Sequence, residues 1–169
     1  IDATFVDAPR QRNTREENET IKSGEVPKEW KENTPKAKHK LAQKDTDARW
    51  TLKFAKARPT PDGKPGIDIA IPSFGYKSHI SIDRRHGIIR RGLVTDAAAY
   101  DGARLREGLI DPNNTASGVW ADSAYRSETN EAYLHGIGKV SHIHRKKPKG
   151  KPMLRSTAKA NAVKSAVRA

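Results

Sequence analysis

The stretch Tyr76-Lys77-Ser78-His79-Ile80-Ser81-Ile82-Asp83, with the turn Arg84-Arg85-His86-Gly87 after it, decides the fold. Side chains at alternate positions of a strand point to opposite faces, and this stretch alternates as a half-buried strand does. Gly87 can take the positive φ of a tight hairpin turn. The stretch from Ile88 to Thr95 then returns as a second strand. One face of the first strand holds Tyr76, Ser78, Ile80 and Ile82, and the other holds Lys77, His79, Ser81 and Asp83.

Downstream of this hairpin the sequence predicts helices and strands in alternation. Ser127 is placed to cap a helix that stops at Gly136. The last helix, from Ser156 onward, is Ala-rich. Its expected buried stripe is Ala160, Val163 and Val167, and its expected solvent-facing or DNA-facing cations are Lys159, Lys164 and Arg168. The expected elements are a helix over 101–107 ending at Gly108, a buried strand over 118–121, a helix over 128–134, a strand over 139–144 and the helix from Ser156.

Upstream, Ile1 to Val6 alternates as a short strand that Pro9 ends, with Asp2, Thr4 and Val6 on one face. From Asp7 to about Gly66 the chain is polar and rich in proline, and only short helices over 14–19 and 36–44 are expected. Its aromatic anchors are Trp30, Trp50 and Phe54. The element order predicts an α/β fold with a mixed sheet covered by helices. An RNase H-like fold is one candidate among several.

Charge is concentrated at one end of the 169-residue chain. Residues 139–169 carry ten Lys or Arg and no Asp or Glu, so they supply +10 of the net charge of +13. Such a stretch attracts a polyanion, and binding releases the counterions condensed on it. Nucleic acid is favoured as the partner over a disordered solubilising tail or an acidic membrane surface. Without cysteine, a signal-peptide pattern or an apolar run of 18 residues, a cytoplasmic protein is expected.

Two aspartates stand out by their surroundings. Asp2 lies within an apolar strand and Asp122 at the end of another. A carboxylate there is costly unless it is paired, hydrogen-bonded or bound to a metal. Taken alone, each is better explained as a cap or turn residue.

Three landmarks change that balance. They are Ile1-Asp2-Ala3-Thr4, then Asp45-Thr46-Asp47-Ala48-Arg49-Trp50-Thr51 with Phe74-Gly75-Tyr76-Lys77-Ser78-His79, and finally Ala121-Asp122-Ser123-Ala124-Tyr125-Arg126-Ser127. In this order, and spread over almost the whole chain, they resemble the bacterial DDE transposases of the insertion-sequence-five family.

The resemblance implies an RNase H-like catalytic core over residues 1–169, with an insertion of about 8–66 and a basic segment 139–169. Asp2 and Asp122 would lie on neighbouring strands and hold Mg²⁺ or Mn²⁺ for phosphodiester hydrolysis and strand transfer. Tyr125 would contact the metal-binding residues without binding the metal itself. The expected partners are transposon ends and target DNA, with a homodimer when the protein is full length and a place at the bacterial nucleoid.

The sequence departs from the family in one respect. The family has a third catalytic acid, a glutamate on a late helix, but the last acidic residue here is Glu131. The helix from Ser156 resembles the start of that glutamate helix, and Arg168 resembles the basic residue one turn before the glutamate. We therefore expect a fragment whose third acid lies beyond Ala169 and whose DNA-binding region precedes Ile1. Such a fragment binds metal weakly and does not complete transposition.

Several further residues are candidates for contact with DNA. Lys77 and His79 share a strand face that is either a phosphate site or an ordinary solvated face. His142 and His144 form a His-x-His pair, for which zinc is disfavoured because no cysteine supports it. The alternatives to a transposase are a non-catalytic basic nucleic-acid-binding protein, an inactive transposase relic, or a nuclease of the same fold. The expected DNA contacts are Lys77, His79, Arg126, Lys146, Lys147, Lys149, Lys151 and Arg168.

Overall fold

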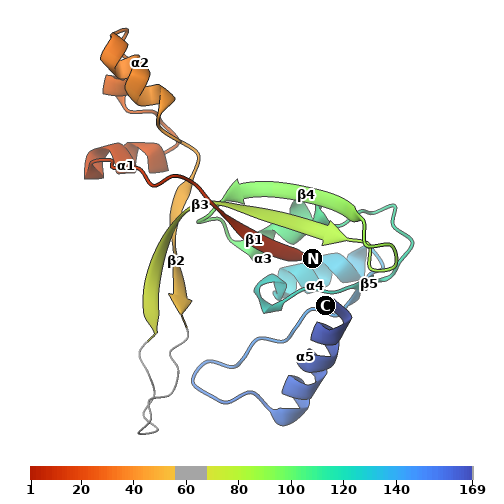
Figure 1. Cartoon of the computed structure of the whole chain (residues 1–169). Helices are drawn as coiled ribbons and strands as arrows, with labels where there is room; N and C mark the ends of the chain where they lie inside the picture. Colours follow the sequence, from red (N-terminus) through yellow and green to blue (C-terminus); the bar gives the residue numbers. More distant parts are fainter. Residues whose placement is uncertain (56–67, 169) are drawn as a thin grey trace, which may run out of the picture. The chain divides into compact units, whose positions relative to one another are not determined.

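The computed structural model of the protein describes residues 1–55 and 68–168 (Figure 1). It is a mixed α/β fold. The chain divides into two compact units. Unit 1 comprises Ile1–Phe5, Lys77–Thr95 and 99–168, and unit 2 comprises Val6–Tyr76, without the undescribed residues 56–67, and Asp96–Ala98. One long strand, β3 (Ile69–Ile82), contributes its first part to unit 2 and its second part to unit 1.

Unit 1 is the larger unit and follows the element order expected from the sequence. Strand β3 is hydrogen-bonded to β1 and to β4, while β5 and β6 form a separate parallel pair. Its elements are β1 (Asp2–Asp7, up to Phe5), the end of β3, β4 (Ile89–Asp96, up to Thr95), α3 (Asp101–Arg104), η2 (Leu105–Leu109), β5 (Gly118–Val119), η3 (Ser123–Tyr125), α4 (Glu128–Gly136), β6 (Val140–Ser141) and α5 (Arg155–Arg168).

The hairpin predicted from residues 76–95 is confirmed. The amide of Gly87 donates to the carbonyl of Asp83 at 2.8 Å, and the amide of Asp83 donates to Ile88 at 2.8 Å. Gly87 has φ of 68°, which explains why glycine suits this position. The cap on α4 is also confirmed, because Ser127 Oγ accepts from the amide of Asn130 at 3.2 Å.

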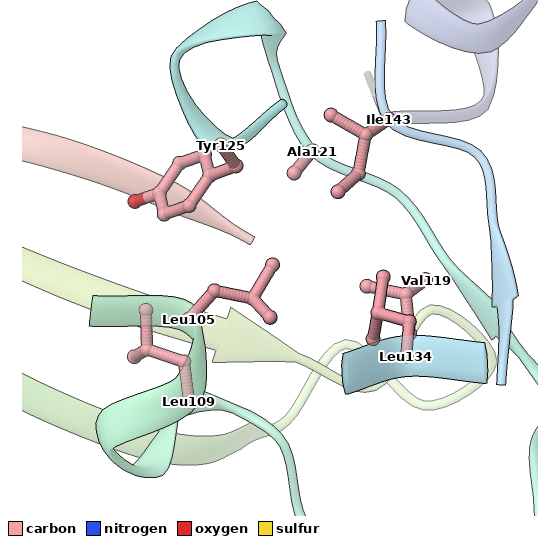
Figure 2. Packing of buried hydrophobic residues seen from close by; sticks show 7 residues of the cluster. All are labelled: Leu105, Leu109, Val119, Ala121, Tyr125, Leu134 and Ile143. Carbon is pink, nitrogen blue, oxygen red and sulfur yellow. The ribbon is translucent and has the colours of Figure 1, made fainter. Parts of the chain in front are cut away.

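The core of unit 1 gathers side chains from η2, β5, η3, α4 and the segment after β6 (Figure 2). Tyr125, Leu105, Leu134 and Ile143 have no exposed surface. Burying each such side chain contributes roughly 1.5–3 kcal/mol, so this cluster holds the short β5 and β6 in place. Its members are Leu105, Leu109, Val119, Ala121, Tyr125, Leu134 and Ile143.

Helix α5 packs differently from the expectation. Val163, expected to be buried, is 61% exposed, whereas Lys164 Nζ donates to the carbonyl of Ile143 at 3.0 Å. Asn161 makes two hydrogen bonds of 3.0 Å with the main chain of Arg145. The helix therefore docks through polar side chains that satisfy main-chain groups after β6. The predicted apolar stripe is wrong for Val163 and for Ala160, which is also exposed, whereas Val167 is half-buried.

Unit 2 has more regular structure than its polar composition predicted. Its elements are α1 (Arg15–Lys22), η1 (Lys28–Trp30), α2 (Pro35–Ala42), β2 (Arg49–Ala55) and the first part of β3. Strand β2 is antiparallel to β3, with Arg49 opposite Gly75 and Ala55 opposite Ile69. Buried Trp30 donates from Nε1 to Glu17 at 2.9 Å, so one indole and one carboxylate organise the small helical core.

Gly75 shows why a glycine stands in the middle of β3. A Cβ at this position would lie 2.1 Å from the carbonyl oxygen of Val6 and 2.8 Å from the nitrogen of Ala8. Because main-chain atoms cannot move aside as side chains do, any larger residue would disrupt the pairing there. The Phe74-Gly75-Tyr76 part of the second landmark therefore has a structural explanation.

Candidate functional site

The two aspartates singled out by the sequence lie on segments that touch. The main-chain nitrogen of Ile1 donates to the carbonyl of Trp120 at 2.8 Å, which joins the start of β1 to the residues that follow β5. Asp2 is one residue beyond this bond on one segment, and Asp122 is two residues beyond it on the other. Neighbouring strands lie about 4.8 Å apart. The bond therefore brings together two segments whose aspartates are 120 positions apart in the chain.

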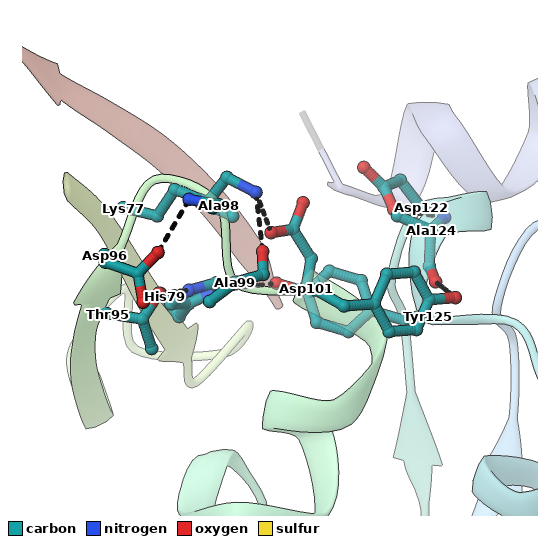
Figure 3. A network of polar contacts seen from close by, with 12 residues as sticks. Lys77, His79, Thr95, Asp96, Ala98, Ala99, Asp101, Asp122, Ala124 and Tyr125 are labelled. Carbon is teal, nitrogen blue, oxygen red and sulfur yellow. Dashed lines mark hydrogen bonds and ion pairs between the residues drawn. The ribbon is translucent and has the colours of Figure 1, made fainter. Parts of the chain in front are cut away.

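Each carboxylate is oriented by a nearby amide. Asp2 Oδ1 accepts from the amide of Ala3 at 2.9 Å, and Asp122 Oδ1 accepts from the amide of Ala124 at 2.8 Å. Asp122 is thereby the cap of η3 (Figure 3). Asp2 lies on the exposed face of β1, so the cost expected for a carboxylate within an apolar strand does not apply to it, and Asp122 is half-buried. Two hard oxygen donors in this setting suit Mg²⁺ or Mn²⁺.

The described residues contain no group of three or more His, Asp or Glu side chains arranged to hold a metal ion. The two histidines of the His-x-His pair each contact another side chain of the protein. His142 stacks on Trp120 with 4.4 Å between ring centroids, and His144 Nε2 lies 3.4 Å from Ser165 Oγ.

The polar face of β3 points into unit 1 and not into solvent. Lys77 Nζ pairs with Asp101 Oδ1 at 2.8 Å and donates to the carbonyl of Ala99 at 2.8 Å (Figure 3). His79 has no exposed surface. The sequence allowed this face to be a phosphate site or a solvated surface. Both predictions are wrong for His79, because its side chain is buried. Lys77 is half-buried and already bound to a carboxylate, which removes it from the exposed cations.

His79 belongs to a small buried polar network. Its Nε2 lies 2.9 Å from Thr95 Oγ1, and its Nδ1 lies 3.4 Å from the hydroxyl of Tyr125. Burial lowers the pKa of His79 below its usual value, and Lys77 and Arg104 act in the same direction although Asp101 opposes them. The ring is therefore neutral at pH 7, and it bridges the sheet to the segment that carries Asp122.

Tyr125 and Arg126 have structural partners. The Tyr125 ring lies in the apolar core, and its hydroxyl points toward His79 (Figure 3). Arg126 pairs with Glu131 at 3.4 Å and donates to the carbonyl of Ile143 at 3.3 Å. Arg126 thus ties η3 to α4 and to the chain after β6, so it is held by the protein and not offered to a phosphate.

The basic loop remains the most accessible set of predicted DNA contacts. Lys146, Lys147, Lys149 and Lys151 are all exposed. Lys146 Nζ lies 3.4 Å from the hydroxyl of Tyr100, itself exposed. Arg168 is the last residue of α5, and its side chain lies outside the described residues.

Sequence reasoning missed one feature of this region. A hollow of about 940 Å³ opens beside Asp2, between the β3–β4 turn and the segment around Trp120. The Arg84 guanidinium lies 5.1 Å from the centroid of the Trp120 ring. In the sequence its signal is the two adjacent arginines Arg84 and Arg85, which pattern alone explains as turn residues.

No protein-family model matches this chain, and neither a curated protein nor a solved structure matches it. Within the described ranges, no helix is both long and apolar enough to cross a membrane.

Proposed function

We propose that the chain is the RNase H-like catalytic core of a DDE transposase of the insertion-sequence-five family. The observation that carries the proposal is the hydrogen bond from Ile1 to Trp120, because it makes neighbours of the segments bearing Asp2 and Asp122. The order of elements supports the same assignment. A hairpin of β3 and β4, a helical segment and the parallel pair β5–β6 follow β1 in the sequence that this fold requires.

The donor set supports a divalent metal at this position. Asp2 and Asp122 would hold Mg²⁺ or Mn²⁺ through carboxylate oxygens, and the amides of Ala3 and Ala124 orient those carboxylates. A bound metal supplies charge to activate a nucleophile and to stabilise the leaving oxygen of a phosphodiester. The role of the protein here is to keep two like charges close together, which is favourable only when a cation is shared.

DNA is the proposed substrate, as transposon ends and target. The exposed lysines of the loop 146–151 are suited to phosphates, which they contact without reading the base sequence. Contacts of this kind position the strand relative to the acids. The homodimer and the nucleoid location remain parts of the same proposal.

The metal site is tested by paramagnetic broadening with Mn²⁺, which detects weak binding. In the ¹⁵N spectrum of the chain, we expect the amides around Ala3 and Ala124 to broaden selectively. Asp2→Asn and Asp122→Asn should each abolish the effect at both segments, because the ion is shared. Asp7→Asn, at the far end of β1, is the matched control and should leave it intact. Broadening of one segment only would contradict a shared ion.

Catalysis is tested on the protein with plasmid DNA that bears the ends of the element. We expect nicking that requires Mg²⁺ or Mn²⁺ and that Asp2→Asn and Asp122→Asn reduce by at least ~10³-fold, as expected for lost metal ligands. Equal nicking by those variants would exclude the proposed chemistry. Nicking without strand joining would assign a nuclease of the same fold.

A non-catalytic nucleic-acid-binding protein is the second candidate, and the ten uncompensated cations of residues 139–169 favour it. Such a protein binds DNA with a steep dependence on salt and no dependence on divalent metal. DNA affinity that is unchanged by Mg²⁺, together with no Mn²⁺ broadening at Asp2, would establish this candidate in place of the first.

A further inference from the structure

The hollow beside Asp2 is built within unit 1 and has mixed chemistry. It is lined by the acid itself, by the turn residues Arg84 and Arg85, and by Ser81, Trp120 and Lys139. Its volume of about 940 Å³ falls within the range of roughly 300–1,000 Å³ typical of small-molecule sites. A strand of DNA that reaches Asp2 would meet this hollow.

Trp120 is held in place by its surroundings. Its ring stacks on His142 with an interplanar angle of 13°, and a Cβ on Gly118 would lie 2.3 Å from the indole. Only glycine at position 118 therefore leaves room for the ring. The Arg84 guanidinium at 5.1 Å is exposed, so it can leave the ring when a flat group competes for the same place. Such an aromatic platform accepts any nucleobase, because every base has a π face.

Ser81 provides an independent indication of a binding site in this hollow. Its side chain is buried and lines the hollow, yet its Oγ has no hydrogen-bond partner among the described residues. A buried hydroxyl without a partner is destabilising. A ligand with a hydrogen-bonding group at this position would supply the partner.

Some charged residues of the hollow have partners within the protein, and others form no ion pair among the described residues. The Asp83 carboxylate pairs with Arg90 Nη2 at 3.1 Å and with His86 Nδ1 at 3.3 Å. Lys139 Nζ donates to the carbonyls of Asn114 and Ala116. In contrast, no ion pair joins Arg84 or Arg85 to an acidic side chain in the described part of the chain. Both are exposed, so they are the cations that a phosphate would meet.

We propose that this hollow binds an unpaired nucleotide of a DNA strand. The base stacks on Trp120, the phosphate pairs with Arg84 and Arg85, and Ser81 hydrogen-bonds the nucleotide. Duplex DNA offers neither a free base face nor a base edge at that depth, so the nucleotide must be out of the stack. The inference rests on the proposed function for its biological setting, because Asp2 lines the same hollow, but its test needs no metal and no catalysis.

The experiment uses the chain labelled with 5-fluorotryptophan and observed by ¹⁹F NMR, without divalent metal. The probe is single-stranded pentathymidylate, and a duplex of equal length is the comparison. We expect the Trp120 resonance, assigned with Trp120→Phe, to shift with saturation, while Trp30 and Trp50 stay unchanged as internal controls. The concentration of duplex that shifts the Trp120 resonance should be at least ~10-fold higher, whatever the duplex binds at the loop 146–151. A Trp120 resonance that stays still, or one that the duplex shifts at equal concentration, would overturn the proposal.

Three substitutions sharpen the result. Arg84→Gln should weaken binding about 5–10-fold, whereas Arg10→Gln, which removes the same charge from unit 2, should leave it unchanged. Ser81→Ala should weaken binding about 5-fold without lowering the urea midpoint, because the hydroxyl has no partner to lose. A residue with only a structural role would lower the midpoint and leave affinity intact, which would contradict the proposal.

The two proposals can fail separately. Asp122→Asn removes the Mn²⁺ broadening if the metal site exists, whereas pentathymidylate binding is measured without divalent metal. Binding of the oligonucleotide without any metal effect would retain the nucleotide site and reject the transposase chemistry. A metal effect without oligonucleotide binding would do the reverse.

Discussion

Lys77 Nζ lies 2.8 Å from Asp101 Oδ1, and this pair joins β3 to the first residue of α3. Lysine and aspartate are only 20% and 25% exposed, so each is largely removed from water and depends on the other. A lysine held in this way cannot bind a phosphate without breaking the pair. The pair therefore belongs to the scaffold that positions the segment of Asp122.

The first prediction concerns this pair. Asp101→Asn should destabilise unit 1 by about 1–2 kcal/mol, since it leaves a half-buried ammonium without its counter-charge. The matched control is Glu107→Gln, which breaks the more exposed pair between Arg104 and Glu107 within one helical segment. It should cost no more than about 0.5 kcal/mol. Urea denaturation measures both, and equal midpoints for the two variants would contradict the assigned role.

The second prediction concerns Asn130, which is 1% exposed. Its Nδ2 donates to the carbonyls of Gly102 and Tyr125 at 2.7 Å, and its Oδ1 accepts from Arg106. Asn130→Ala leaves two buried carbonyls without donors and should lower the free energy of unfolding by about 2–4 kcal/mol. Asn113→Ala, at an exposed turn, should change it by less than about 0.5 kcal/mol. A small effect at Asn130 would show that water replaces the amide.

The sequence predicted the order of elements in unit 1 because local signals determine it. Glycine at position 87 and serine at position 127 fix a turn and a helix start through short-range geometry. Unit 2 was underestimated for a physical reason. Its core depends on the contact of Trp30 with Glu17, 13 positions away, and no periodic pattern announces such a contact.

The candidate site was predicted less completely. Alternation separates the two faces of β3 but does not say which face is buried, and here the polar face with His79 turns inward. The sequence predicted that Lys77 and Arg126 contact DNA. In the structure they form ion pairs with Asp101 and Glu131, respectively. Long-range pairs of this kind depend on how the elements pack, so composition and spacing could not reveal them.

The third prediction is a pH dependence from His79. Burial holds the pKa of His79 below its usual value, so the unfolded chain takes up a proton at a higher pH than the folded one. Stability contributed by the neutral ring is therefore present above the ordinary histidine pKa and is lost as the pH falls below it. Urea midpoints should decrease between pH 7.5 and pH 5. His79→Gln should flatten this dependence, and exposed His135→Gln should not.

The fourth prediction concerns acid unfolding of unit 2. Burial alone would raise the pKa of Glu17, but hydrogen bonds from Lys40, Thr14 and Trp30 outweigh it and lower the pKa to about 2. Stability from the ionised carboxylate is thus complete above about pH 4.5 and declines as the pH falls toward 2. The shift corresponds to about 3 kcal/mol. Fluorescence of Trp30 should report this loss of stability. In the Glu17→Gln variant, the stability should already be lost at neutral pH. Exposed Glu25→Gln should match the parent chain, and a parent-like titration of Glu17→Gln would exclude this role.

The fifth prediction concerns the basic loop. Lys146, Lys147, Lys149 and Lys151 are exposed, and each contact with a phosphate releases about 0.9 of a counterion from duplex DNA. Replacing all four by Gln should lower the slope of log affinity against log salt by about 3–4. Because phosphate contacts carry no sequence information, affinity for unrelated duplexes should fall by the same factor. Fluorescence anisotropy at several salt concentrations measures both quantities.

A matched control separates the loop from net charge alone. Replacing Arg10, Lys22, Lys31 and Lys36 of unit 2 by Gln removes the same charge from exposed positions elsewhere. If DNA only sensed the total charge of the protein, both quadruple variants would weaken binding alike. However, attraction between exposed charges is largely screened beyond about 10 Å at moderate salt. We expect the slope to change for the loop variant alone. Equal slopes would remove the loop from the DNA interface and leave Arg84 and Arg85 as the cations that a strand meets beside Asp2.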